Sequence, residues 1–373
     1  MIPVFEPLIG KEEFKNVNDC LETNWISSAG KYISQFEKSF ANFHGVKHAI
    51  ALSNGTAALE VALHASGIKK GDEVIVPSFT IISVAVAVMR LGAIPRFADV
   101  ELDTWNIDPS YIESLINRKT RAIIAVHSFG HPAAIDKILD IAQSHQLKVI
   151  EDTAEALGSK YKDKLCGTFG DIGTFSLYAN KLITTGEGGI LITNNDDYAL
   201  LARKYINLYF GQTERFSHED LGFNFRMTNI QASIGCAQIE KIDFYSSEKI
   251  RIGKIYEEKI SYLENFSFQK TLPNTHHVYW MYTLLASDSL NLSGFEIVRL
   301  LKERGVDSRQ LFKGLHLQKP LKRFLLKDQK KLTVTEHLYE KGFYLPSSLK
   351  LTEKDIEFIL DTLNDVASCK TKK

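Results

Sequence analysis

A lysine in a loop rich in Ser, Thr and Gly is the side chain of this sequence best suited to covalent chemistry. Lys181 lies in GTFSLYANKLITTGEGGIL (173–191), between two apolar segments that resemble strands. A lysine held against a sheet loses its proton readily because desolvation disfavours the ammonium form, and the neutral amine is a nucleophile for an aldehyde. The alternative is an exposed loop lysine, the usual environment of this residue type.

Two carboxylates end another apolar segment, in VIEDTAEALGS (149–159). Ligands of open α/β sheets bind at the carboxyl ends of the strands, and a carboxylate at that edge could hold a protonated ring nitrogen. Asp152 is the candidate for this role. The alternative is that Asp152 caps the following helix, while Glu151 or Glu155 is only solvated.

A turn in SNGTAAL (53–59) leads from a short apolar segment directly into a helical pattern. The first N–H groups of a helix have no partner inside it, so they form an anion site suited to a single phosphate. The segment lacks the lysine of a P-loop and the three glycines of a dinucleotide fingerprint. A plain turn at Asn54-Gly55, with Thr56 as an early helix residue, is the alternative.

These three features together are the parts that pyridoxal 5'-phosphate requires. That cofactor needs a lysine that forms a Schiff base, a partner for its pyridinium nitrogen and a phosphate site. We therefore predict pyridoxal 5'-phosphate as the cofactor.

The elements that must position these residues alternate between strands and helices. The expected strands are 48–53, 73–77, 94–100, 120–128, 147–153, 172–178 and 188–194. The expected helices between them are 56–66, 81–91, 109–117 and 134–145. This alternation predicts an α/β fold with a mostly parallel sheet covered by helices on both faces.

The second part of the chain has a different pattern. We expect helices at 196–208, 229–263, 294–305 and 351–367, a loop at 210–225 and a strand at 277–286. Residues 1–240, with the N-terminal segment included, are predicted to form the large cofactor-binding domain. Residues 241–373 are predicted to form a smaller α+β domain.

Composition and charge exclude several classes of protein. The 45 basic and 45 acidic residues cancel, so no overall field would hold nucleic acid. Four cysteines lie far apart, which makes a zinc site or a disulfide framework unexpected and favours a reducing cytoplasm. Polar residues interrupt the most apolar window, 74–89, so we expect no membrane span. The N-terminal residues do not have the pattern of a signal peptide.

The chain resembles the DegT/StrS sugar aminotransferases, which have the aspartate aminotransferase fold (pyridoxal-phosphate fold type I). The segments that carry the resemblance are WISSAGKYISQFE, SNGTAALEVAL, GDEVIVPSFT, IEDTAEALGSKY, GTFGDIGTFS, NKLITTGEGG and GFNFRMTNIQASIGCAQI. The resemblance implies transamination of a nucleotide-linked 4-keto-6-deoxy sugar, with glutamate as the amino donor, for a surface polysaccharide such as O-antigen.

The resemblance also implies catalytic roles for individual residues. Lys181 would hold the cofactor as a Schiff base and then move the proton between cofactor and sugar. Asp152 would pair with the pyridinium nitrogen and keep it protonated. Glu155 would lie near the ring hydroxyl of the cofactor, at a position where many relatives have Gln.

The phosphate site and the assembly follow from the same comparison. Gly55 and Thr56 would donate backbone N–H groups to the phosphate, and Ser176 its hydroxyl. Asn224 would reach the phosphate of the neighbouring subunit's cofactor. The active unit implied is a homodimer with composite sites.

The resemblance is weaker at two places. At Ile81 the family has an aromatic ring stacked on the cofactor, and Phe79 lies two residues earlier. In VDSRQLFKGLHLQKP the substrate candidates are Arg309, Phe312 and His316, although relatives often have Pro at the position of Gly314. An ordinary surface histidine is the alternative for His316. The segment HHVYWMY is expected to be core.

Several alternatives remain at this stage. The substrate could be a UDP- or dTDP-linked keto sugar, or an 8-keto sugar acid. Lys181 argues against a dehydratase of the same fold, in which His replaces the lysine, and TTGEGG favours a 4-keto over a 3-keto substrate. A non-enzymatic regulator with this fold would usually carry a DNA-binding domain, for which 373 residues leave no room.

Overall fold

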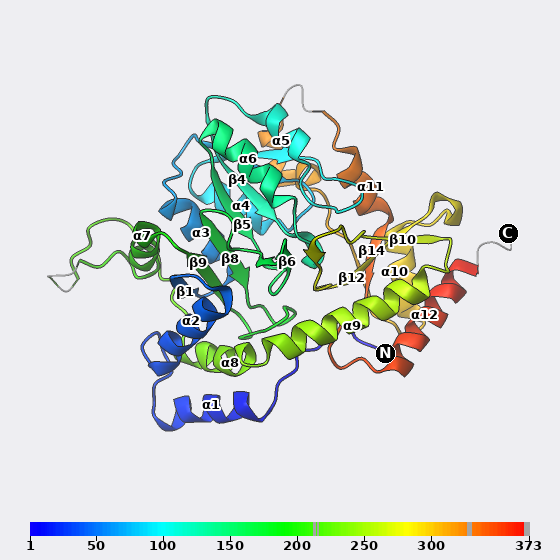
Figure 1. Cartoon of the computed structure of the whole chain (residues 1–373), viewed down its shortest axis with the longest axis horizontal. Coiled ribbons are helices and arrows are strands. Elements are labelled where there is room, and N and C mark those ends of the chain that lie inside the picture. The colour runs from blue at the N-terminus through cyan, green and yellow to red at the C-terminus, as the bar shows by residue number, and fades with distance from the viewer. Residues whose placement is uncertain (212–213, 215, 327–329, 369–373) are drawn as a thin grey trace.

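The computed structural model describes residues 1–211, 214, 216–326 and 330–368 (Figure 1). Cys369 and the basic end of the chain therefore lie outside the described residues. The central sheet has seven strands in the order β1-β9-β8-β5-β4-β2-β3. Their bounds are His48–Leu52 (β1), Glu73–Pro77 (β2), Ile94–Ala98 (β3), Thr120–Val126 (β4), Lys148–Asp152 (β5), Ile172–Ser176 (β8) and Gly189–Thr193 (β9).

The direction of one strand was not predicted. The strands from β8 to β3 pair in parallel, whereas β9 runs antiparallel to both β1 and β8. The connection from β8 to β9 contains the loop that carries Lys181 and includes no helix in the described structure. Because the chain returns through this loop alone, β9 runs back beside β8, whereas a parallel neighbour would need a crossover connection.

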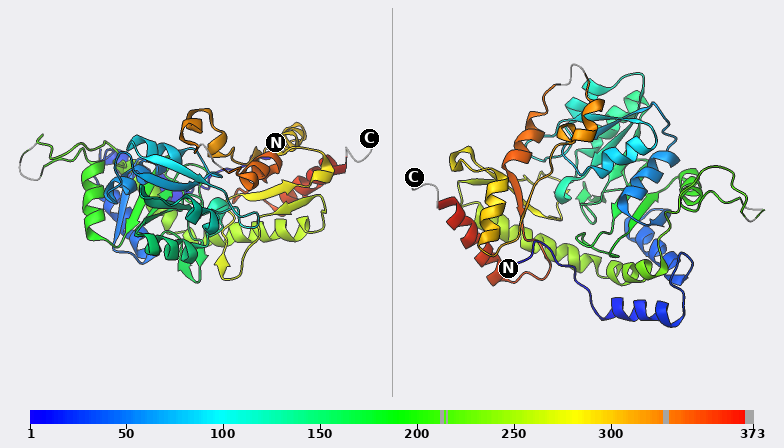
Figure 2. Two further views of the ribbon diagram at one scale, coloured as in Figure 1. Left: turned by 90° about the horizontal axis from the view of Figure 1, so that it is seen from above. Right: turned by 180° about the vertical axis from the view of Figure 1, so that it is seen from behind.

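Helices cover both faces of the sheet, as predicted (Figures 1 and 2). One face packs against α3 (Gly55–Ala65), α4 (Ser83–Arg90) and α7 (Asp196–Ile206). The opposite face packs against α2 (Lys31–His44), α5 (Pro109–Leu115), α6 (Ile135–His145) and α8 (Asn229–Ile239). Side chains along a strand alternate between the two faces, so Ile150 packs on the first group and Val149 on the second.

A second sheet follows in the chain, with the order β10-β12-β14-β13 and antiparallel pairing throughout. Its strands are Phe266–Phe268 (β10), Tyr282–Ala286 (β12), Arg309–Gln310 (β13) and Gly342–Leu345 (β14). The helices of this part are α9 (Ile242–Ile260), α10 (Gly294–Glu303), α11 (Thr333–Lys341) and α12 (Glu353–Ser368). A small sheet joins β6 (Lys160–Tyr161) and β7 (Lys164–Leu165) to β11 (Thr275–His276).

The first residues of the chain, which were predicted to belong to the large domain, also contact the second part of the chain. Ile2 pairs with Val306, and the N–H of Ser347 donates to the carbonyl of Val4, so these first residues pack on the second part of the chain. The next helix, α1 (Lys11–Glu22), packs against α8. The N-terminal segment thus contacts both parts of the protein.

The prediction of one long helix at 229–263 is wrong in one respect, because the structure has two helices there, α8 and α9. Lys241 has non-helical backbone angles between α8 and α9, and its amine pairs with Glu13 of α1. α8 is buried by α1 and α2, whereas α9 continues to the second sheet. The residue pattern does not show this break. The helical pattern of the sequence is continuous across Lys241, and the break depends on how the two helices pack in the folded protein.

The strand expected at 277–286 begins only at Tyr282. Before it, Tyr279 has a positive φ of 48°, and the N–H of Trp280 donates to the carbonyl of Phe129. This segment therefore leaves the sheet and turns toward the first part of the chain.

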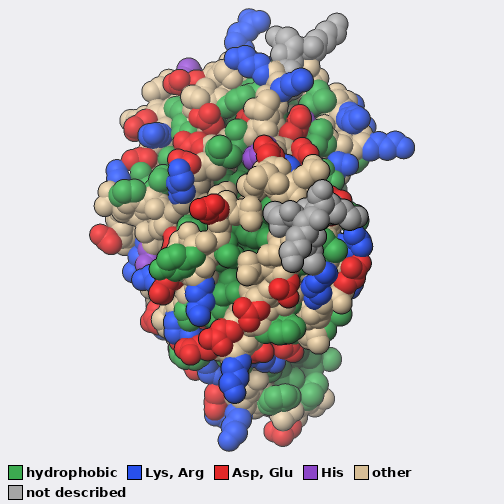
Figure 3. Space-filling view, turned by 90° about the vertical axis from the view of Figure 1, so that its right-hand side faces the viewer, with side chains coloured by type: hydrophobic (Ala, Val, Ile, Leu, Met, Phe, Trp, Pro, Cys, Tyr) green, Lys and Arg blue, Asp and Glu red, His purple; other side chains and the backbone are tan. Residues whose placement is uncertain are grey.

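Charge and apolarity are distributed as the composition implies. Figure 3 shows acidic and basic side chains interspersed over one face of the molecule. Among the helices of the described ranges, none is both long and apolar enough to cross a bilayer. The three described cysteines, Cys20, Cys166 and Cys236, are buried free thiols.

Candidate active site

A cavity of about 740 Å³ opens at the carboxyl ends of the parallel strands. β5 ends there at Asp152 and β8 ends at Ser176, while α3 begins there at Gly55. The predicted site residues on its wall are Gly55, Thr56, Ile81, Asp152, Glu155, Ser176, Lys181 and Phe312. Segments far apart in the sequence thus meet at one edge of the sheet, as ligand sites of open α/β sheets do.

The start of α3 forms an anion cradle. The side chain of Asn54 caps the helix by accepting the N–H of Ala57 at 2.8 Å. The N–H groups of Gly55 and Thr56 have no acceptor within the described part of the chain. A Cβ at Gly55 would lie 2.9 Å from the Cβ of Ser176, so only glycine lets the start of α3 approach the end of β8 this closely. Two free N–H groups beside a serine hydroxyl suit a phosphate.

Asp152 is buried at the end of β5, and one carboxylate oxygen accepts the N–H of Ala154 at 3.1 Å. Burial raises the pKa of this carboxyl, and the Ala154 N–H and Lys181 oppose the rise. No helix directly follows Asp152 in the described structure, so it does not cap one as the alternative required. Its contact with Ala154 closes a turn, and its side chain also faces the cavity.

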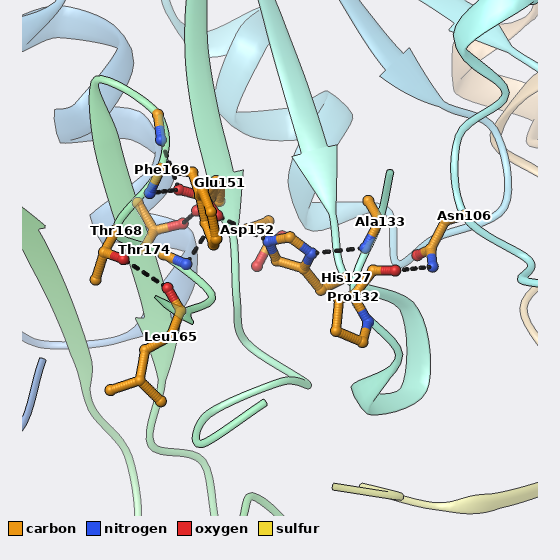
Figure 4. Close-up of polar contacts among 12 residues, drawn as sticks. Asn106, His127, Pro132, Ala133, Glu151, Asp152, Leu165, Thr168, Phe169 and Thr174 are labelled. Carbon is orange, nitrogen blue, oxygen red and sulfur yellow. Dashed lines mark hydrogen bonds and ion pairs between the residues drawn. The ribbon is translucent and has the colours of Figure 1, made fainter. Parts of the chain in front are cut away.

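A buried hydrogen-bonded pair, His127 and Glu151, lies beside Asp152 (Figure 4). The Nε2 of His127 is 3.0 Å from Glu151, and its Nδ1 accepts the N–H of Ala133. A ring that accepts at Nδ1 carries its proton on Nε2 alone, so His127 is the neutral tautomer that donates to Glu151. Burial of the ring also disfavours its charged form.

Glu151 is not solvated, contrary to the alternative considered from the sequence. Its side chain is fully buried and accepts N–H groups from Gly167, Phe169 and Gly170. Burial would raise the pKa of this carboxyl, but the His127 contact and these N–H groups lower it. These contacts therefore favour the carboxylate form of Glu151.

Lys181 projects into the same cavity, where its amine faces two carboxylates. Burial lowers the pKa of the amine, whereas Glu155 and Asp152 act in the opposite direction. Desolvation is the larger effect, so the neutral nucleophilic form of the amine is favoured relative to a lysine in water.

Glu155 connects the site to a strained turn. Its Oε2 accepts the N–H of Phe129 at 2.8 Å, and Phe129 has a positive φ of 54°. Burial raises the pKa of Glu155 to about 7, since it outweighs the attraction of Lys181 and the Phe129 N–H. A carboxyl with this pKa exchanges its proton near neutral pH.

Glu155→Gln is expected to change how stability of the cofactor-free protein depends on pH. Because the folded pKa lies above the ordinary value of 4.5, the folded state binds more protons, and wild-type stability falls as pH rises through this interval. The loss amounts to about 3 kcal/mol for a shift of this size. Glutamine cannot ionise, so the free energy of unfolding of the variant should rise relative to wild type between about pH 5 and about pH 8. Urea unfolding at the two pH values measures this difference.

Glu187→Gln is the matched control, because Glu187 lines the same cavity but is exposed. Its difference from wild type should be the same at both pH values. A difference between Glu155→Gln and wild type that does not change with pH would contradict a buried, protonated Glu155.

The remaining predicted residues lie at different distances from this cavity. Ile81 is on the cavity wall and 45% exposed, whereas Phe79 is fully buried among aromatic rings and does not replace it. Phe312 stacks on Phe129, with ring centroids 5.2 Å apart, and reaches the wall. Asn224 is exposed, and its Oδ1 accepts from Arg226 at 2.9 Å. The described wall of this chain's cavity does not include Asn224.

Two substrate candidates are not brought to the cavity. Arg309 pairs with Asp307, and neither Arg309 nor His316 is part of the described wall. His316 is buried, with its Nδ1 2.7 Å from the hydroxyl of Ser78, so it is not the surface histidine considered as an alternative. Both side chains are held by neighbours that a sequence pattern does not reveal.

Arg90, Trp280 and Tyr344 are among the wall residues that the sequence did not single out. Arg90 pairs with the buried carboxylate of Glu60 at 3.0 Å. Trp280 and Tyr344 come from the second part of the chain, where aromatic residues at strand spacing were expected to be core. In that segment, the alternating aromatic pattern gives no sign that one ring leaves the sheet.

The residues present fit pyridoxal 5'-phosphate. A lysine amine faces two carboxylates, and two helix N–H groups without an acceptor lie beside a serine hydroxyl in the same cavity. Gly55, Thr56 and Ser176 would hold the phosphate, and Asp152 the ring nitrogen. No cluster of metal-binding side chains occurs among the described residues.

Comparison with known proteins gives full-length matches. The model of the DegT/DnrJ/EryC1/StrS aminotransferase family matches residues 7–364. The chain is 41% identical to a GDP-perosamine synthase of Caulobacter vibrioides, over 98% of each chain. It is 40% identical to a GDP-perosamine synthase of Escherichia coli O157:H7, over 99% of each chain.

The solved structures agree with these matches. An aminotransferase from Psychrobacter cryohalolentis superposes with a TM-score of 0.91 and 30% identity, covering 97% of this chain and 98% of that one. The aspartate aminotransferase fold expected from the resemblance is thereby confirmed.

Proposed function

Because the chain belongs to the DegT/DnrJ/EryC1/StrS aminotransferase family, we propose that it transfers the amino group of glutamate to a GDP-linked 4-keto-6-deoxy sugar, as in GDP-perosamine synthesis. Membership of the family makes it a pyridoxal-phosphate-dependent sugar aminotransferase. Within the chain, HSFGHP, DTAEALGSKYK and the TTGEGG block support likeness to GDP-perosamine synthase.

The observation that carries the proposal is the amine of Lys181, held in one cavity with Asp152, Glu155 and the start of α3. When bound, pyridoxal phosphate supplies the carbonyl that exchanges an amino group and a ring that accepts electrons from the reacting carbon. The proposed function adds the sugar and the donor to this chemistry.

The residues divide the work among themselves. The N–H groups of Gly55 and Thr56 and the hydroxyl of Ser176 bind the phosphate. Asp152 would hold a proton at the ring nitrogen, and the Ala154 N–H and Lys181 favour its anionic form. In each half-reaction the neutral amine of Lys181 would accept a proton at Nζ and return it before that half-reaction ends. In the first half-reaction the donor carbon would lose this proton, and in the second the sugar carbon would gain it.

A panel of nucleotide-linked keto sugars tests the substrate. We expect GDP-4-keto-6-deoxymannose with glutamate to give the product whose mass shows oxygen replaced by an amino group. UDP- and dTDP-linked 4-keto sugars and an 8-keto sugar acid are the other arms. Conversion of one of these, with the GDP sugar unchanged, would replace the proposed substrate while leaving the aminotransferase assignment in place.

A homodimer with shared sites is part of the proposal. Figures 1 and 2 show the segment after α7 extending away from the body of the protein. Asn224 lies in this segment, exposed and outside its own chain's cavity. Leu221, close to it, is 88% exposed, as expected of a side chain that a partner covers. We propose that Asn224 binds the phosphate in the neighbouring subunit.

Mixing inactive variants is expected to restore activity if the sites are shared. In a heterodimer of Lys181→Ala with Asn224→Ala, one site carries both changes and the other carries neither. About half of the heterodimer sites should therefore work, measured as 2-oxoglutarate formation after the subunits have exchanged. The experiment requires that Asn224→Ala alone is strongly impaired.

Lys181→Ala mixed with Asp152→Asn is the control, because both residues act in their own chain's site and no heterodimer site is intact. Heterodimers that form with Asn224→Ala but recover no activity, or an active monomer, would exclude the shared site.

The proposed role is in the synthesis of a surface polysaccharide such as O-antigen, with the enzyme in the cytoplasm. Three buried free thiols support a reducing compartment.

A further inference from the structure

We propose that Trp280 is a positioning residue for Lys181, and that its indole face holds the protonated amine within reach of the reacting carbon. The inference rests on the aminotransferase part of the proposed function and is independent of the sugar. Trp280 comes from the segment that precedes β12, on the second part of the chain, whereas Lys181 lies in the loop between β8 and β9.

The contact between the two side chains is direct. The Nζ of Lys181 lies 3.7 Å from the centroid of the Trp280 ring. The face of an indole ring attracts a cation more strongly than the other aromatic side chains do, and the attraction grows when water is excluded. Trp280 is 5% exposed and lies on the cavity wall, so little water reaches this contact.

The indole is fixed in place by its own bonds. Its Nε1–H donates to the carbonyl of Asn180 at 2.7 Å, and Asn180 directly precedes Lys181. The ring that receives the amine is therefore bonded to the loop that carries it. Phe129 stacks on the indole with centroids 5.7 Å apart and an angle of 25°. The ring can neither rotate nor tilt without breaking these contacts.

The backbone of Trp280 is held as firmly. Its N–H donates to the carbonyl of Phe129 at 3.0 Å, and its carbonyl accepts from the Nζ of Lys249 at 2.6 Å. Lys249 is a buried lysine of α9 that also donates to the carbonyl of Ser347. Buried hydrogen bonds thus fix the backbone of Trp280, the residue whose ring contacts the Lys181 amine.

The charges around the Lys181 amine explain why an uncharged partner such as the indole is needed. Asp152 and Glu155 face Nζ from the end of β5 and the following turn, and both attract it when it is protonated. The other titratable side chains on the wall are Arg90, Tyr178, Glu187 and Tyr344. A lysine that accepts a proton and returns it in each half-reaction must not form a lasting ion pair with either carboxylate. The indole attracts the ammonium without accepting its proton.

Cofactor capture by the cofactor-free protein tests the inference without any sugar. The rate at which pyridoxal phosphate combines with Lys181, followed by visible absorbance, depends on the neutral amine and so on pH. Trp280→Leu removes the attraction for the charged form, so the midpoint of this pH profile should fall by about one unit. Trp280→Phe keeps a weaker ring face and should give an intermediate midpoint.

Turnover with glutamate supplies the second readout. Trp280→Leu should lower kcat about tenfold, with KM for glutamate changed by less than about twofold, because the donor does not need the indole to bind. Trp280→Phe should recover part of kcat. If Trp280 only helped glutamate to bind, its replacement would raise KM for glutamate and leave kcat unchanged.

Trp105→Leu is the matched control. Trp105 is a fully buried ring of the same aromatic cluster, in contact with Phe79 and Phe129 but not part of the cavity wall. This variant should lose stability and keep the wild-type midpoint. If Trp280→Leu does not fold, Trp280→Phe decides the question.

The inference is overturned if the foldable Trp280 variants keep the wild-type midpoint, or if Trp105→Leu moves it equally. Trp280 would then be a packing residue only. Failure of the proposed function is a separate result, because an enzyme that captures the cofactor normally but converts none of the sugars has lost only the substrate assignment.

Discussion

Lys181→Ala is expected to reduce transamination by at least about a thousandfold. The variant loses the amine that attaches the cofactor and also the group that moves the proton, and general acid–base catalysis alone contributes roughly a hundred- to ten-thousandfold. Only noncovalent contacts, among them those of Gly55, Thr56, Ser176 and Asp152, would then retain the cofactor. The rate of 2-oxoglutarate formation from glutamate measures the loss, and absorbance after gel filtration shows weaker retention of the cofactor.

Lys137→Ala is the control, since Lys137 is an exposed lysine of α6, away from the cavity. It should have wild-type activity. Normal turnover by Lys181→Ala would refute the central assignment of the site.

Asp152→Asn is expected to fold and to bind the cofactor but to lose at least about a hundredfold in activity. The amide oxygen can still accept the Ala154 N–H, so the local structure is kept. A neutral amide cannot hold the proton on the ring nitrogen, however. Each pKa unit lost by that nitrogen is worth about 1.4 kcal/mol, and a change of a few units gives the expected loss.

The loss should appear in kcat more than in cofactor retention, and steady-state kinetics with glutamate separates the two. Asp140→Asn, at an exposed position of α6, should behave as wild type. Retention of more than half of the activity by Asp152→Asn would contradict its role.

The buried hydrogen bond between His127 and Glu151 could not be read from the residue pattern. HSFGHP indicates only a turn with two histidines, and Glu151 was considered a solvated carboxylate. Their 3.0 Å contact arises because β4 and β5 pair in parallel and bring the two strand ends together. Which strands pair is decided by contacts between residues distant in the sequence, and the apolar runs of the strands do not encode it.

The candidates in the second part of the chain show the same limit. Arg309 and His316 were selected by alignment, whereas Trp280 and Tyr344 reach the cavity wall. The turn at Tyr279 removes Trp280 from the strand. It depends on the hydrogen bond from the Trp280 N–H to the carbonyl of Phe129. A short aromatic segment has the same pattern whether its rings are buried in a core or line a cavity.

Local chemistry was enough to single out Lys181, Asp152 and the start of α3 as candidates, and the structure brings them to one cavity. A cap, a Gly-containing turn and a polar end to an apolar run are formed by residues adjacent in the chain, so residue types at short spacing predict them. The alternation of strands and helices predicted the sheet covered on both faces in the same way. Tertiary structure alone decided that β9 is antiparallel, that the helix divides at Lys241, and that Trp280 lies against Lys181. These features depend on packing between segments that are distant in the sequence, and the contacts that stabilise them form only when the chain folds.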